Sequence, residues 1–95
     1  MATELLSVRL MANPSVVSAE VDNESVLLDL ETDTYFGLNR LGCQVWARLQ
    51  QGLTGDEIVQ HLRGQFQVPE AQLRDDVRSF LRDLQAQGLV QAAGT

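Results

Sequence analysis

The sequence has no lysine, one cysteine, one histidine and no long apolar run. A single cysteine excludes an internal disulfide, and Cys43 together with His61 cannot supply the ligands of a Cys/His zinc cage. No apolar stretch approaches the ~20 residues that cross a bilayer, and residues 1–4 lack the basic start of a signal peptide. We therefore expect a cytoplasmic protein with no metal, no cofactor and no membrane partner.

Positive charge is also scarce, because seven arginines face 13 acidic residues and the formal net charge is -6. Proteins that bind nucleic acid use clustered Lys and Arg side chains to displace counterions from phosphates. The charge balance therefore disfavours a nucleic-acid partner. It favours solubility, which suits a freely diffusing adaptor.

The length of 95 residues and the apolar content of 44% allow one domain with one modest core. We expect a loosely docked lead-in over residues 1–13, closed by Asn13-Pro14, because this pair is a turn signal. The domain itself is expected over residues 14–91. Leu89-Val90 dock as an extended segment in this interpretation, and residues 92–95 form a tail.

Three short segments rich in β-branched and aromatic residues predict strands at 16–21, 25–30 and 34–38. Polar turn residues separate them, at Asp22-Asn23-Glu24 and at Glu31-Thr32-Asp33. The three strands follow one another closely, so we expect one antiparallel sheet. At least one edge of such a sheet is unpaired and offers free N–H and C=O groups.

Three helices are expected after the strands. Asn39 is placed to cap the first, which Gln51-Gly52 ends, and Thr54 with Glu57 forms a capping-box sequence for the second. Pro69 opens the third at its first helical position, and this helix runs up to Gly88. The expected apolar faces consist of Leu41, Val45, Trp46 and Leu49 in the first helix, Ile58, Val59, Leu62 and Phe66 in the second, and Leu73, Val77, Phe80, Leu81 and Leu84 in the third. Strands followed by helices predict the α+β class.

No arrangement of residues predicts catalysis. Cys43 and His61 lie on different predicted helices without a local activating partner, so a hydrolase built on them is a weak alternative. The pairs Asp56-Glu57 and Asp75-Asp76 are helical neighbours that point about 100° apart, so they do not converge on one metal ion. Asp76 directly precedes Val77 on the apolar side, and we interpret it as a polar group at the margin of a groove.

Arg74, Arg78 and Arg82 lie on one face of the third helix. Glu70 is spaced to pair with Arg74 and Asp75 with Arg78, which would neutralise much of the stripe. Our interpretations, in order, are a solvated face, attraction to an acidic peptide segment, and DNA recognition by a winged-helix regulator.

The third strand carries two adjacent aromatic residues, Tyr35 and Phe36. Neighbouring side chains in a strand point to opposite faces, so only one ring can enter the helix-covered core. Gly37 has no side chain, which permits another backbone to come close. This strand is therefore the first candidate for binding an extended partner.

These segments together resemble the PqqD-like proteins, the recognition elements for ribosomally made and post-translationally modified peptides. The resemblance covers about residues 15–91 and rests on the order and spacing of short motifs. These are the run from Val26 to Asn39, then Gly42, Val45-Trp46, Gly52-Leu53-Thr54, Ile58-Val59, Asp76-Val77 through Leu81, Leu84 and Gly88-Leu89-Val90.

The resemblance implies a winged helix-turn-helix whose third strand receives the leader segment of a precursor peptide as an added strand, against the third helix. β-Strand addition takes affinity from main-chain hydrogen bonds and specificity from pockets for alternate side chains. Carried onto this sequence, the binding residues are the strand Thr34, Tyr35, Phe36, Gly37 and Leu38 and the helix residues Leu73, Arg74, Asp76, Val77 and Phe80, with Arg74 or Arg78 at the rim.

The Tyr35-Phe36-Gly37-Leu38-Asn39 run is similar to the stand-alone recognition proteins of lasso-peptide pathways. That similarity implies two partner enzymes, a leader peptidase and an ATP-dependent macrolactam cyclase, which would hold the catalysis. A PQQ-type or other peptide chaperone working with a radical-SAM enzyme is the alternative within the same family.

Overall fold

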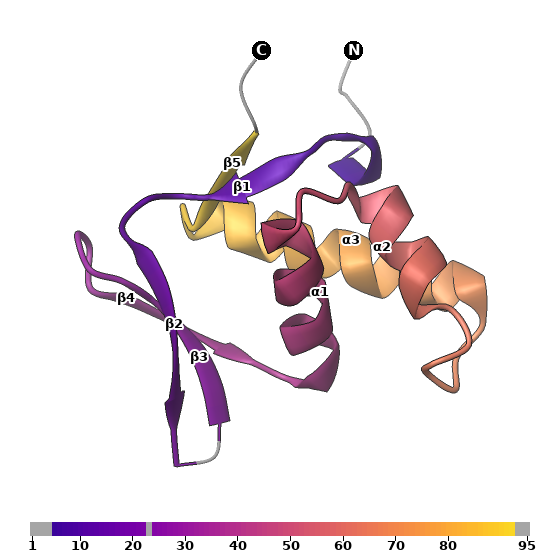
Figure 1. Ribbon diagram of the computed structural model, residues 1–95, viewed down its shortest axis with the longest axis horizontal. Helices are drawn as coiled ribbons and strands as arrows, with labels where there is room; N and C mark the ends of the chain where they lie inside the picture. The colour runs from indigo at the N-terminus through magenta and orange to yellow at the C-terminus, as the bar shows by residue number, and fades with distance from the viewer. Residues whose placement is uncertain (1–4, 23, 93–95) are drawn as a thin grey trace.

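The computed structural model describes residues 5–22 and 24–92 (Figure 1). It contains a three-stranded antiparallel sheet followed by three α-helices, which confirms the α+β expectation. In chain order the elements are η1 (Leu5–Ser7), β1 (Leu10–Ala12), β2 (Val16–Val21), β3 (Glu24–Asp29), β4 (Thr34–Leu38), α1 (Arg40–Gln50), α2 (Gly55–Leu62), α3 (Glu70–Ala86) and β5 (Val90–Ala92). Within the described ranges, no helix has the length and hydropathy needed to cross a membrane.

The sheet has the strand order β2-β3-β4, and its register places Leu27 of β3 between Ser18 of β2 and Phe36 of β4. Both connecting turns use a left-handed residue, Asp22 at φ 52° and Asp33 at φ 58°. Aspartate tolerates this conformation better than most residues, because its short polar side chain can hydrogen-bond locally. The turn chemistry read from the sequence therefore produces the meander, and the strands begin within one residue of their expected positions.

The N-terminal segment is packed more tightly than a loosely docked lead-in. Leu6 and Leu10 are fully buried, and β1 pairs antiparallel with β5. Asn13 extends this pairing through its backbone N–H, which donates to the Leu89 carbonyl at 3.0 Å. The expectation of loose docking is therefore wrong for residues 5–13, because their apolar side chains complete the core. The tail expected at 92–95 lies outside the described residues apart from its first position.

Helix starts follow the capping signals. The Asn39 side chain accepts from the Gly42 N–H at 2.7 Å. Thr54 and Glu57 form the full capping box. The Thr54 N–H donates to the Glu57 carboxylate at 2.8 Å, and the Glu57 N–H donates to the Thr54 hydroxyl at 3.3 Å. The backbone N–H of Thr54 holds the pKa of the Glu57 carboxyl below its usual value. The structure confirms the cap of α1 and the capping box of α2.

Two helix boundaries differ from the expectation. Pro69 is the N-cap of α3, so the helix begins one residue later, at Glu70. Helix α2 ends at Leu62, and Gly64 then adopts a positive φ of 86°. Phe66 consequently lies in the following loop, where its ring packs partly on the core and under the guanidinium of Arg40 at 5.1 Å.

The core lies where the inner face of the sheet, the three helices and the β1–β5 pair meet (Figure 1). Its fully buried centre consists of Leu6, Leu10, Leu27, Val45, Ile58, Val59, Leu62, Leu73, Val77, Leu81, Leu84 and Leu89. At roughly 1.5–3 kcal/mol for each fully buried aliphatic side chain, this cluster is the main source of stability. It also fixes α3 in place relative to the sheet.

Candidate functional site

The outer edge of β4 is not paired with any described strand, because β4 lies at one end of the sheet and pairs only with β3. The phase of the hydrogen bonds across the sheet follows from one contact outside the ladder. The Leu30 N–H donates to the Ser15 carbonyl at 2.9 Å. Counting backward along β3 from Leu30, every second residue therefore bonds to β2, and the residues between them bond to β4.

This alternation, carried through the β3–β4 register, turns the backbone groups of Thr34, Phe36 and Leu38 toward β3. The N–H and C=O groups of Tyr35 and Gly37 therefore point to the free edge. The spacing of these four groups allows them to hydrogen-bond with an added strand, either parallel or antiparallel to β4.

The side chains of β4 alternate between the two faces of the sheet. Thr34, Phe36 and Leu38 are half-buried on the face toward the helices, whereas Tyr35 is 60% exposed and Gly37 is exposed. The expectation that only one of the two aromatic rings enters the helix-covered side is confirmed, and that ring is Phe36. A Cβ added at Gly37 would meet nothing within 4 Å, so no described neighbour requires glycine at this position.

A cavity of about 360 Å³ lies beside the C-terminal end of β4, between the start of α1 and one side of α3. It is lined by Asn39, Leu41, Gly42, Asp76, Ser79, Phe80 and Asp83. The ring of Phe80 contacts Phe36 edge to face, with ring centroids 6.0 Å apart, and so joins the cavity to the strand. We call the free edge of β4 and this cavity together the β4–α3 groove.

Asp76 lies at the margin of this groove, half-buried and hydrogen-bonded to the Gln72 side chain at 2.8 Å. Asp83 and Ser79 lie on the same side of α3 and were not expected from the sequence. A helical signal could have found Asp83, because it lies seven residues after Asp76 and three after Phe80. The groove therefore combines an aromatic floor with two carboxylates on one wall.

Several expected binding residues do not reach the groove. Leu73 is 2% exposed and Val77 is fully buried, so both belong to the core. Arg74 forms an ion pair with Asp56 of α2 at 2.9 Å, and it lies about 120° around α3 from Phe80. The expected pairing of Arg74 with Glu70 does not form, because Glu70 pairs with Arg63 at 3.2 Å.

The remaining chemistry-bearing residues form no recognisable site. Arg78 pairs with Asp75 at 2.9 Å, as expected. His61 is exposed on α2, and Cys43 is half-buried on α1. Among residues 5–22 and 24–92, no group of three or more His, Cys, Asp and Glu side chains is placed to hold a metal ion.

Two solved structures are similar to this chain over most of its length. One is TbiB1 in complex with the TbiA(beta) leader peptide, with 37% identity, a TM-score of 0.76, and coverage of 88% of this chain and 98% of that one. The other is lasso peptide synthetase B1 complexed with the leader peptide, with 23% identity, a TM-score of 0.79, and coverage of 87% of this chain and 98% of that one. The second likeness shows the fold alone. No curated protein matches the sequence.

The family described as coenzyme PQQ synthesis protein D (PqqD) matches residues 24–90. This range begins at β3 and ends at the start of β5, so it includes β4, α3 and the whole β4–α3 groove. The match covers well over half of the chain, and the chain therefore belongs to the PqqD family.

Proposed function

We propose that this protein binds the leader segment of a ribosomally synthesised precursor peptide in lasso-peptide biosynthesis. The observation that carries this proposal is the unpaired edge of β4 beside the cavity at α3. The 37% identity with TbiB1, a protein solved with a leader peptide bound, supports the same function.

In this proposal the leader adds as a strand to β4. Its backbone bonds to the free N–H and C=O groups of Tyr35 and Gly37, which sets the register. Side chains of the leader then alternate between the two faces of the sheet. Those on the inner face contact Phe36 and Phe80, and those that extend toward α3 meet Asp76.

The proposed site differs from the one expected from the sequence in its helix residues. Phe80 and Asp76 stay in the site, and Ser79 and Asp83 join them. Leu73 and Val77 act by fixing α3 from the core side.

We also propose that the protein is an adaptor without catalytic activity, and that a leader peptidase and an ATP-dependent cyclase act on the bound precursor. Cys43 and His61 lie on separate helices, and neither has an interaction with the other in the described part of the chain. Catalysis then belongs to the partner enzymes.

A fluorescence anisotropy titration tests the proposal directly. The probe is a labelled leader peptide from the precursor gene encoded beside this protein. We expect saturable binding with a Kd at or below about 1 μM, which corresponds to ~8 kcal/mol. The absence of saturable binding to any co-encoded precursor leader would overturn the proposed function.

A further inference from the structure

The sheet has a second free edge, on β2. Within the described residues, β2 pairs only with β3. The hydrogen-bond phase set by Ser15 and Leu30 turns the backbone groups of Val16, Ser18 and Glu20 away from β3. The Val16 N–H is occupied, because it donates to the Asn13 carbonyl at 3.0 Å. Both backbone groups of Ser18 and of Glu20 remain available.

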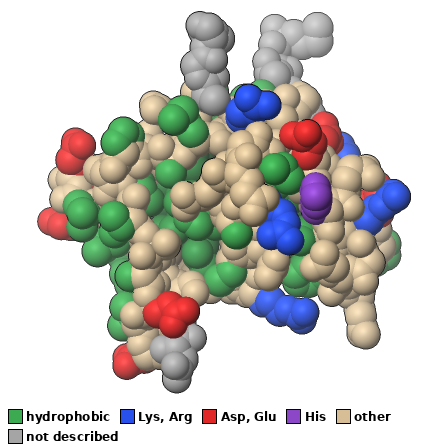
Figure 2. All heavy atoms as spheres, in the orientation of Figure 1, with side chains coloured by type: hydrophobic (Ala, Val, Ile, Leu, Met, Phe, Trp, Pro, Cys, Tyr) green, Lys and Arg blue, Asp and Glu red, His purple; other side chains and the backbone are tan. Residues whose placement is uncertain are grey.

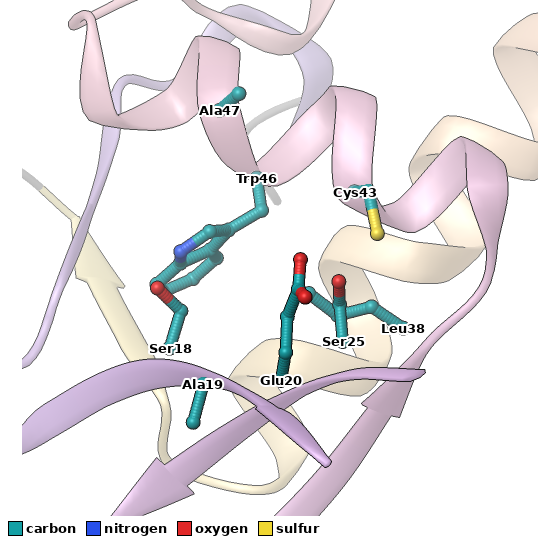
Figure 3. A pocket seen from close by; sticks show the side chains of 8 residues that line it. All are labelled: Ser18, Ala19, Glu20, Ser25, Leu38, Cys43, Trp46 and Ala47. Carbon is teal, nitrogen blue, oxygen red and sulfur yellow. The ribbon is translucent and has the colours of Figure 1, made fainter. Parts of the chain in front are cut away.

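A cleft of about 320 Å³ lies between α1 and the inner face of the sheet, and it extends from β2 across β3 to Leu38 of β4. Figure 3 shows the Glu20 carboxylate and the Ser25 hydroxyl pointing from the sheet toward α1, with Cys43 and Trp46 on the facing side. We call this space the β2–α1 cleft; it is lined by Ser18, Ala19, Glu20, Ser25, Leu38, Cys43, Trp46 and Ala47.

Two polar groups in the wall of the cleft have no partner in the described part of the chain. Trp46 is only 5% exposed, and its indole Nε1–H is buried without a hydrogen-bond acceptor. Buried polar groups are normally paired, but this nitrogen has almost no accessible surface, so an acceptor in the cleft would reach it only if the Trp46 side chain shifted. The Glu20 side chain is exposed, and its carboxylate has no hydrogen bond or ion pair with residues 5–22 and 24–92, so it is solvated and available to a cation.

Native proteins usually protect an edge strand with proline, lysine or a bulge. β2 has none of these over its six residues, and Val17 and Val21 are 41% and 48% exposed on its outer face. Glu20, however, points from this strand toward α1, and an inward-pointing charge also protects an edge, so strand addition here requires a segment that neutralises Glu20.

The charge on the sheet indicates what kind of segment fits. Residues 15–39 contain six acidic residues and no basic one, while the other seven acidic residues of the chain are matched by its seven arginines. The whole net charge of -6 therefore comes from the sheet segment. In the view of Figure 2, basic side chains lie over the helices and the N-terminal segment, and hydrophobic side chains gather on the sheet side.

A second copy of this chain is a poor occupant of the cleft, because it would bring another acidic sheet against Glu20. We propose that the β2–α1 cleft binds an extended, basic segment of a processing enzyme, with a Lys or Arg side chain paired with Glu20. This inference rests on the proposed function for the identity of the partner. Two separate edges would let the protein hold the leader and the enzyme at the same time.

The charge preference of the cleft can be measured without the partner, because Cys43 is the only cysteine. The folded protein is treated in turn with cystamine and with dithiodiglycolate, and the mixed disulfide at Cys43 is quantified by mass spectrometry. We expect the cationic reagent to be favoured, and the preference to fall in Glu20→Gln but not in Glu24→Gln, which removes the same charge one strand away. An equal change in both variants, or no preference, would contradict a cation site at Glu20.

Docking is tested with two proline variants of the full chain, Ser18→Pro and Tyr35→Pro. Each removes an outward N–H from one free edge and leaves the ladder to β3 intact. Binding to the co-encoded leader peptide is measured by anisotropy. Binding to the co-encoded leader peptidase and to the cyclase, each without leader, is measured by biolayer interferometry.

We expect Ser18→Pro to weaken binding to one of the enzymes by about fivefold or more and to leave leader affinity unchanged, with the reverse result for Tyr35→Pro. Glu20→Lys, with Glu24→Lys as its control, repeats the enzyme measurement without a backbone change. The inference is overturned if neither enzyme binds, if Ser18→Pro and Glu20→Lys bind both enzymes normally, or if sedimentation shows a wild-type dimer that Ser18→Pro abolishes. Failure of the leader to bind the wild-type protein would instead overturn the proposed function.

Discussion

Replacement of Phe80 by alanine tests the aromatic floor of the β4–α3 groove. Phe80 is half-buried, and its ring stands at 70° to the ring of Phe36. A Phe→Ala change at a fully buried position costs about 3–5 kcal/mol. Because Phe80 is only partly buried, we expect about half of that cost in the free energy of unfolding, so the fold should survive.

The effect on leader affinity follows from the exposed part of the ring. If the bound leader covers about 40–60 Å² of it, the lost burial is worth about 1–1.5 kcal/mol at 25 cal/mol per Å². That loss raises the Kd of the leader about 5- to 13-fold. The measurement is the anisotropy titration, at a temperature where circular dichroism shows that the variant is folded.

Phe66→Ala is the matched control. Phe66 is also half-buried against the core, but its ring lies under Arg40 and does not line the groove. We expect this variant to lose stability and to keep the wild-type affinity for the leader. Equal losses of affinity in both variants, or unchanged affinity in Phe80→Ala, would refute the assignment of Phe80 to the binding surface.

Three further predictions concern the scaffold. Asp29 is 5% exposed and accepts from Ser15 and from the Glu31 N–H, which together hold its pKa below the usual value. Asp29 therefore makes its full contribution to stability above the unfolded pKa near 3.9, and this contribution is lost as the pH falls through the folded pKa. Urea titrations at several pH values should show that the free energy of unfolding depends less on acid pH in Asp29→Asn than in the wild-type protein. Gly55→Ala should lower Tm through a loss of about 1–3 kcal/mol, because its Cβ would lie 2.6 Å and 2.9 Å from atoms of Leu6, whereas Gly37→Ala should leave Tm nearly unchanged. Thr54→Ala should cost about 1 kcal/mol in chemical denaturation, and a smaller loss in Thr54→Ser would assign that cost to the capping hydroxyl.

Local signals predicted the strands and the helix starts well. Turn residues such as Asp22 and Asp33 and caps such as Asn39 and Thr54 act within a few residues, so their effect can be read from the sequence. The β1–β5 pair could not be read in this way. Each strand has three residues, and the partners are about 80 positions apart in the chain, so no local pattern marks the pairing.

In the candidate site too, local patterns could be read from the sequence and tertiary contacts could not. Strand alternation correctly predicted that only one of Tyr35 and Phe36 enters the helix-covered side, and the structure shows that this residue is Phe36. The apolar face of α3 did not separate core residues from groove residues. Val77 and Phe80 both lie on that face, and only the packing of α2 and η1 on one side decides that Val77 is buried. The partner of Arg74 likewise depends on tertiary structure, since Asp56 is on another helix.

The central claim is that the leader adds as a strand to β4 through Tyr35 and Gly37. Amide hydrogen exchange, measured by NMR with and without the co-encoded leader peptide, tests it at single residues. We expect the amides of Tyr35 and Gly37 to exchange fast in the free protein and to become protected on binding, while those of Ser18 and Glu20 do not change. Protection at Ser18 and Glu20 instead, or unchanged exchange at Tyr35 and Gly37 in a saturated complex, would contradict it.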